Sequence, residues 1–121
     1  MFLSGGNVPP FLNEQKKIIE ESIAEKIFID IQHSKQGMFI KGLNIQNPVI
    51  LYLHGGMPDY FLTRKHPVKL EDQFTLVWWD QRGAGISSKS KFNEKGALDQ
   101  LINDTVSVTK YLMKRFKKDK I

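Results

Sequence analysis

The chain has 121 residues, of which 40% are hydrophobic and 26% are charged, and it contains no cysteine. That length suits one modest domain, and the composition excludes a disordered, collagen-like or disulfide-stabilised protein, a thiolate zinc site and a cysteine nucleophile. The formal net charge of +5 is compatible with nucleic acid or an anionic membrane as a partner.

Residues 1–21 contain Gly5-Gly6 and Pro9-Pro10 and have no sustained hydrophobic periodicity, which predicts a loose N-terminal arm. The N-terminus lacks the basic and apolar regions of a signal peptide, and no window approaches the roughly 18 apolar residues of a membrane span. We therefore expect a soluble cytoplasmic protein with one folded domain over residues 22–121.

Two short strands are predicted at the start of this domain. Ile27, Ile29 and Ile31 recur at a period of two, which indicates a half-buried strand. A turn around residues 33–35 then leads to a second strand over residues 37–41.

Two continuous apolar runs follow, at Val49–Leu53 and at residues 74–79. Such runs are typical of parallel strands that are covered on both faces. Residues 57–73 between them leave room for a crossover connection, so a right-handed unit of two parallel strands is predicted. Trp78 and Trp79 are adjacent in the second run and should point to opposite faces as core residues.

One long amphipathic helix is predicted near residues 97–117. Its apolar face, expected to dock on the sheet, comprises Leu98, Leu101, Ile102, Thr105, Thr109, Leu112, Met113 and Phe116. Asp99 and Asp104 lie toward its start, where the helix dipole favours acidic groups. The basic residues near its end are Lys114, Arg115, Lys117, Lys118 and Lys120, and we interpret them as a solvated helix end rather than a nucleic-acid site.

The first apolar run ends in His54-Gly55-Gly56. Glycines directly after a buried strand let the backbone turn sharply and present N–H groups to a cleft without a Cβ in the way. Such groups suit an oxyanion hole, whose donors lie about 3 Å from the developing negative charge. Gly56 is the predicted donor, with Gly55 beside it.

The second run ends in the segment Asp80-Gln81-Arg82-Gly83-Ala84-Gly85-Ile86-Ser87. Asp80 and Arg82 are expected to pair with each other and hold the turn, while Gly83 and Gly85 permit positive φ angles. We assign this segment, together with His54 and Ser87, to the architecture around the site.

Other chemistry is less well supported. Ser87 lacks the closing glycine of a Gly-x-Ser-x-Gly nucleophile motif. His33 and His66 are expected at the surface, and His54 fits a hydrogen-bonded strand end better than a general base. The histidines have no carboxylate at ligand spacing, and the glycines at 83 and 85 lack the third glycine of a dinucleotide fingerprint, so neither a metal nor a cofactor is predicted.

Taken together, the two motifs resemble the N-terminal part of an α/β-hydrolase of the proline iminopeptidase-like branch, over about residues 22–121. The resemblance implies an α/β fold with about four strands in the order 1-2-4-3. It implies a serine hydrolase, most often an aminopeptidase, that acts on peptides or small esters by acyl transfer, with Gly56 as an oxyanion donor. The sequence departs from the family at Met57-Pro58, because Pro58 has no N–H to donate.

The nucleophile, acid and histidine of the family's triad have no counterpart in these residues, so we expect an incomplete domain that is inactive alone. The resemblance also makes the strand at residues 49–53 an edge, which predicts self-association through it. Two alternatives stay open: a non-enzymatic module that binds through this edge, and an ester-cleaving relative of the same family.

Overall fold

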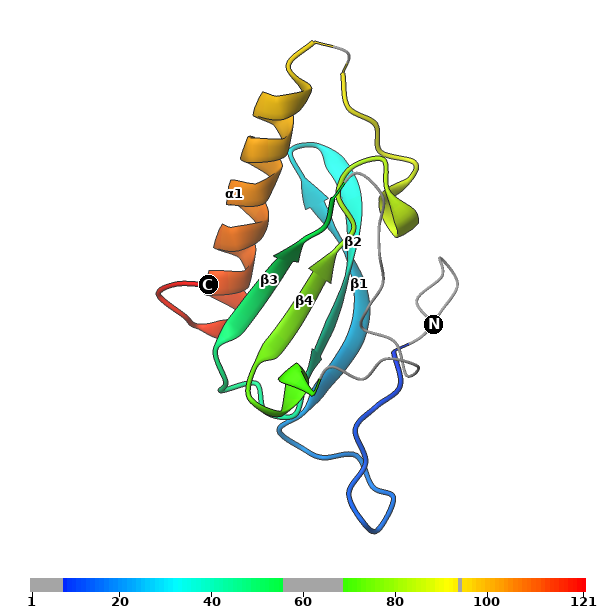
Figure 1. Cartoon of the computed structure of the whole chain (residues 1–121), viewed down its shortest axis with the longest axis vertical. Coiled ribbons are helices and arrows are strands. Elements are labelled where there is room, and N and C mark those ends of the chain that lie inside the picture. The colour runs from blue at the N-terminus through cyan, green and yellow to red at the C-terminus, as the bar shows by residue number, and fades with distance from the viewer. Residues whose placement is uncertain (1–7, 56–68, 94) are drawn as a thin grey trace.

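The fold is given by a computed structural model, which describes residues 8–55, 69–93 and 95–121. Its strands are β1 (Ile23–Ile31), β2 (Ser34–Gly42), β3 (Val49–Leu53) and β4 (Thr75–Trp79). A 20-residue helix, α1 (Ala97–Phe116), follows two short 3₁₀ turns, η1 (Leu70–Asp72) and η2 (Gly85–Ser87). Figure 1 shows α1 lying along one face of the sheet.

The four strands form one mixed sheet in the order β1-β2-β4-β3. β1 and β2 are antiparallel, β2 and β4 are antiparallel, and β3 runs parallel to β4 with Leu53 opposite Trp79. The predicted strand order and the parallel pair are therefore confirmed. Most of the predicted crossover, including His66 and Pro58, lies outside the described residues.

The β1–β2 hairpin is longer than predicted. Its turn consists of Gln32 and His33, which both have positive φ, and Ile31 pairs with Ser34 on either side of it. This is the backbone geometry of a tight two-residue hairpin. The predicted turn begins one residue and ends two residues too late, because the first part of β2 is polar and is held by pairing with β1 rather than by an apolar pattern.

Two hydrophobic clusters fill the two faces of the sheet. Beneath α1 the core includes Met38, Ile40, Val77, Trp79, Val108 and Leu112. On the opposite face Phe39, Leu76 and Trp78 pack with Val8 of the N-terminal arm and with Ile86 of η2. Trp78 and Trp79 thus lie on opposite faces, as the alternation of strand side chains requires.

The existence and the limits of α1 match the prediction, but the predicted docking face is confirmed only in part, at Leu101, Leu112 and Phe116. Leu98 and Ile102 are 69% and 51% exposed, whereas Asp104 is fully buried. The apolar stripe of the helix is wider than its contact with the sheet, and the contact is centred on Leu101, Val108 and Leu112. The stripe predicted the helix correctly without predicting its rotation.

None of the helices in the described ranges combines the length and the apolar character that a membrane crossing requires.

Candidate functional site

The candidate site lies where β3 and β4 end. Because these strands are parallel and in register, their carboxyl ends meet at the same edge of the sheet (Figure 1). His54 and Gly55 follow β3 directly, and Asp80 follows β4. The two sequence motifs are therefore brought together as the parallel arrangement predicts.

His54 joins the two strand ends. Its Nε2 accepts a hydrogen bond from the backbone N–H of Gln81 at 3.0 Å, and the Gln81 side-chain amide donates to the His54 carbonyl at 2.9 Å. An imidazole that accepts at Nε2 carries its proton on Nδ1, which lies within hydrogen-bonding distance of the Gly55 carbonyl. Both ring nitrogens are engaged and the side chain is 8% exposed. These contacts hold the His54 ring between the ends of β3 and β4.

Aromatic rings support the same strand end from the sheet face opposite α1. The Tyr52 and Trp78 rings are stacked with their centroids 4.4 Å apart, and the His54 and Trp78 rings are 6.3 Å apart and nearly parallel. Stacking of this kind restricts ring rotation. His54, the residue before Gly55, is therefore packed against the buried Trp78 ring.

Gly55 is exposed, and a Cβ added to it would have no heavy atom of the described residues within 4 Å. Positive φ occurs at Gly83, Gly85 and Gly96, but not at Gly55. Nothing in the described fold thus requires a glycine at this position. Gly56, the predicted oxyanion donor, lies outside the described residues.

Asp80 is fully buried and holds the turn after β4. Its Oδ1 accepts from the Trp78 indole N–H and its Oδ2 from the backbone N–H of Ile86, both at 2.9 Å. The predicted pairing of Asp80 with Arg82 was wrong. Arg82 points to α1 instead, because a carboxylate on the helix offers both oxygens to its guanidinium.

Ser87 is 1% exposed and fully engaged. Its hydroxyl donates to the Asp80 carbonyl and accepts from the backbone N–H of Gly37 at 2.8 Å. Gly83 and Gly85 have φ angles of 82° and 48°, as predicted for this turn. Ser87 therefore links the turn to β2, and its hydroxyl is not available as a nucleophile.

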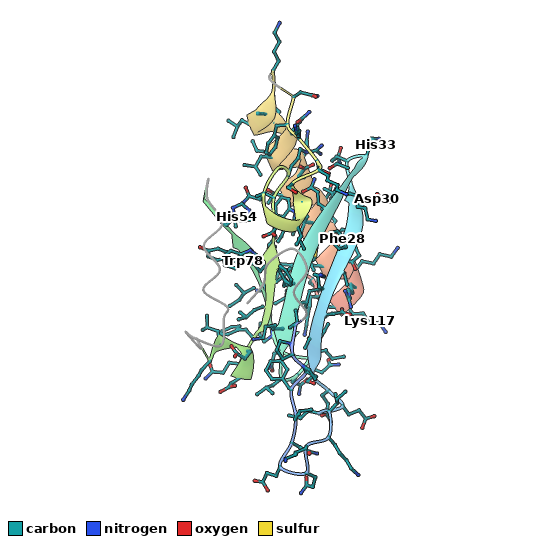
Figure 2. The ribbon with its side chains drawn as sticks, turned by 90° about the vertical axis from the view of Figure 1, so that its right-hand side faces the viewer. Phe28, Asp30, His33, His54, Trp78 and Lys117 are labelled. Carbon is teal, nitrogen blue, oxygen red and sulfur yellow. The ribbon has the colours of Figure 1, made fainter. Side chains whose placement is uncertain are left out.

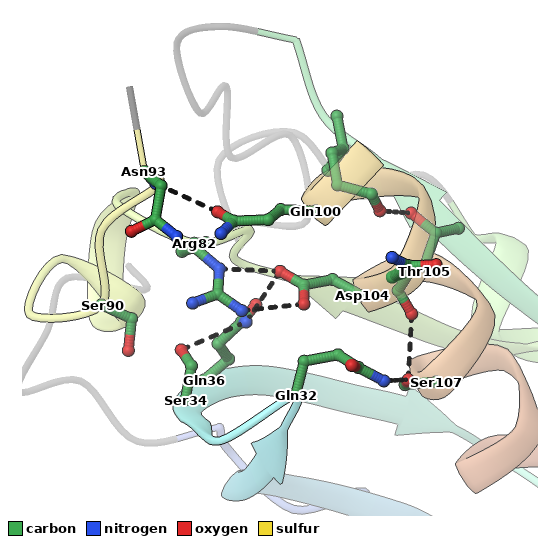
Figure 3. Close-up of polar contacts among 12 residues, drawn as sticks. Gln32, Ser34, Gln36, Arg82, Ser90, Asn93, Gln100, Asp104, Thr105 and Ser107 are labelled. Atoms are coloured by element: carbon green, nitrogen blue, oxygen red, sulfur yellow. Dashed lines mark hydrogen bonds and ion pairs between the residues drawn. The ribbon is translucent and has the colours of Figure 1, made fainter. Parts of the chain in front are cut away.

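A buried polar network beside the turn was missed by the sequence prediction (Figure 3). Arg82 donates from Nε and Nη2 to the two oxygens of Asp104, each at 2.9 Å. Gln36 donates to Asp104 at 3.0 Å and accepts from the indole N–H of Trp79 at 3.0 Å. The available signal was the position of Asp104 between Leu101 and Val108 on the buried side of the helix.

The titratable groups with shifted pKa values lie away from this edge, on the last turns of α1. Burial raises the pKa of Tyr111 and lowers that of Arg115. Arg115 pairs with Glu25 of β1 and donates to the Tyr111 hydroxyl. This contact ties α1 to an edge strand and has no evident part in chemistry.

Across residues 8–55, 69–93 and 95–121, no three histidine, aspartate or glutamate side chains come together as a metal site would require. His33 lies exposed in the hairpin turn. At the strand ends, Gly55 leaves backbone exposed beside the buried His54.

The fold and the site define an α/β protein with a mixed four-stranded sheet. A glycine follows one of its two parallel strands, at the end of the sheet where both strands terminate. Over 105 residues the chain is 38% identical to the probable aminopeptidase YbaC of Bacillus subtilis strain 168, a match that covers 84% of this chain. The chain spans about a third of the length of that curated relative (33%). No family model matches the chain. No solved structure matches it either.

Proposed function

We propose that the edge formed by the ends of β3 and β4 is the oxyanion-binding part of a serine hydrolase of the proline iminopeptidase-like branch of the α/β-hydrolases. Its reaction is the release of N-terminal residues from peptides by acyl transfer. The similarity to a probable aminopeptidase supports peptide substrates. The observation that carries the proposal is Gly55, which is exposed and unobstructed although the fold does not need a glycine there.

In this proposal the residues of the chain act by position. The His54–Gln81 pair fixes the backbone after β3. The backbone N–H groups of Gly55 and Gly56 are the proposed donors to the oxyanion of the tetrahedral intermediate. A fixed donor stabilises charge that develops in the transition state without reorganising. The reactive serine and its acid and base belong to polypeptide other than these 121 residues, because the sequence contains no Gly-x-Ser-x-Gly motif.

A chimera tests this proposal. This chain replaces the matching third of the Bacillus subtilis relative, and hydrolysis of a prolyl anilide is measured for the chimera and for the relative. Gly55→Ala in the chimera is expected to leave the melting temperature unchanged, because its Cβ meets no atom of the described part of the chain within 4 Å. The value of kcat/KM is expected to fall about 10²-fold, because the added Cβ would misplace the substrate carbonyl slightly relative to the reacting groups.

Gly37→Ala is the matched control, since its Cβ would lie 2.3 Å from the Ile86 side chain. This variant is expected to lower the melting temperature, in contrast to Gly55→Ala. Full activity of Gly55→Ala, or turnover by the 121-residue chain alone, would contradict the proposal. Faster cleavage of a short-chain ester than of any aminoacyl anilide would favour the ester-cleaving alternative.

The exposed edge of the sheet favours a second candidate function, binding by strand addition. β3 ends the sheet and pairs with β4 alone among the described strands, and Leu53 is 50% exposed. An apolar edge strand of this kind is a template for another strand. The partner proposed is a second copy of the chain.

Ile50→Lys is expected to abolish concentration-dependent dimerisation in sedimentation velocity, because a charge on β3 is incompatible with a packed strand beside it. Ile18→Lys, at a 66% exposed position in the arm, is the control and should dimerise normally. A monomeric wild-type chain at all concentrations would rule out this function.

A further inference from the structure

An open pocket apart from the strand ends lies on the sheet face opposite α1. It has a volume of about 500 Å³, and its lining comes from β1, β2 and the segment after β4, namely Phe28, Lys35, Gly85, Ile86, Ser88, Lys89 and Ser90. β1 and β3 are the two edges of the sheet, and Figure 2 shows Phe28 and His54 well apart. The pocket shares Gly85 and Ile86 with the turn after β4, but its other wall is formed by β1 and β2, on the side of the sheet away from β3.

The walls of this pocket are held together by close packing and by hydrogen bonds. A Cβ at Gly37 would lie 2.3 Å from Cδ1 of Ile86 and 2.9 Å from Cε1 of Phe28, so these two side chains meet over a glycine. The Ser90 hydroxyl donates to the Lys35 carbonyl at 2.7 Å. Bonds from both Ser87 and Ser90 to β2 thus fix the outer wall, and the pocket is formed before any ligand enters.

The charges at the pocket are predominantly positive. Lys35 and Lys89 line it, and neither belongs to an ion pair in the part of the chain that the structure describes. Asp30 is the nearest acidic residue in the strand register, directly across from Lys35, yet no ion pair joins them. Two ammonium groups on one pocket favour an anion.

The floor is apolar and includes an aromatic ring. Phe28 is 43% exposed on a sheet face where Phe39 is 1% exposed. The Lys35 ammonium lies 5.5 Å from the centroid of the Phe28 ring. A ring that is exposed beside cations and hydroxyls can cover the flat apolar part of a ligand, which is the usual composition of a small-molecule site.

We propose that this pocket binds a small organic anion, in which a phosphate or carboxylate group is joined to a flat apolar body. The ammonium groups of Lys35 and Lys89 and the Ser88 hydroxyl contact the oxyanion. Phe28 and Ile86 contact the apolar body.

The test is a two-dimensional ¹H–¹⁵N NMR titration of the 121-residue chain with phenyl phosphate. Saturable shifts are expected at the amides of Lys35, Ile86 and Ser88–Ser90. Benzoate distinguishes a carboxylate ligand from a phosphate ligand, while phenol and inorganic phosphate each supply only half of the recognised chemistry and should bind more weakly. Shifts that do not saturate, or that spread over lysines throughout the chain, would overturn the proposal.

Variants separate the two halves of the site. Lys35→Gln or Lys89→Gln should raise the dissociation constant for phenyl phosphate about tenfold, the cost of one charged hydrogen bond. Phe28→Ala should weaken the binding of phenyl phosphate but leave the binding of inorganic phosphate unchanged. Asp30→Asn should tighten the binding of both ligands. Lys110→Gln, an exposed position on α1, is the control. An unchanged dissociation constant in both pocket lysine variants would refute the assignment, and their spectra show directly that they remain folded.

Discussion

Asp104→Asn is expected to lower the free energy of unfolding by about 3–5 kcal/mol, the typical cost of breaking a buried ion pair from one side. The reason is that both Asp104 oxygens accept from Arg82, and one also accepts from Gln36. An amide keeps the shape but offers one acceptor, and it leaves the guanidinium largely buried without its charge partner. Urea unfolding followed by circular dichroism measures the change.

Asp99→Asn is the control for this experiment, because Asp99 is exposed in the first turn of the same helix and should change stability little. The pair itself is isolated by a double-mutant cycle with Arg82→Gln. The double variant should be less destabilised than the sum of the two single variants. Equal stability of Asp104→Asn and Asp99→Asn would show that the ion pair does not hold the turn to α1.

Asp80→Asn is expected to cost about 1–3 kcal/mol through a buried donor left without an acceptor. Oδ1 of Asp80 accepts from the Trp78 indole N–H, and Oδ2 accepts from the Ile86 backbone N–H. An asparagine side chain has one oxygen and one NH₂ group, so either orientation points a donor at a donor. The same unfolding measurement gives the change in stability.

Asp72→Asn, at an exposed position in η1, provides the comparison for Asp80→Asn. Since the Asp80 turn also carries Ile86 into the core on the sheet face opposite α1, loss of this contact should reduce packing around Phe39 and Trp78 as well. If Asp80→Asn and Asp72→Asn unfolded at the same urea concentration, the Asp80 carboxylate would contribute no more to stability than an exposed one.

The strands and the helix could be predicted because their signals are local. Two uninterrupted apolar runs gave β3 and β4 within one residue of their limits, and spacings of three and four gave α1. The strand order came from the resemblance to a known family, since periodicity carries no information on which strands are neighbours. The site motifs meet because parallel strands end at one edge, which follows once the strands are known.

The contacts that depend on tertiary distance could not be predicted. Asp80 and Arg82 are two residues apart, and short separation favoured pairing them, yet Arg82 reaches Asp104 on α1. The Arg82–Asp104 ion pair also explains why the docking face of α1 was predicted only in part. A buried carboxylate such as Asp104 requires a buried cation opposite it, and the helix sequence alone does not show that cation. Gln36 donates to Asp104 and accepts from Trp79, and nothing in the sequence pattern of β2 indicates these two contacts.

The two adjacent tryptophans have a practical consequence for following this molecule in solution. Trp78 donates to Asp80 and stacks on Tyr52, whereas Trp79 donates to Gln36 beneath α1. Each indole is buried, and each N–H is bonded to a different part of the fold. Fluorescence from variants that keep a single tryptophan therefore reports separately on the strand-end turn and on the seating of the helix, so loosening of one face can be distinguished from loosening of the other.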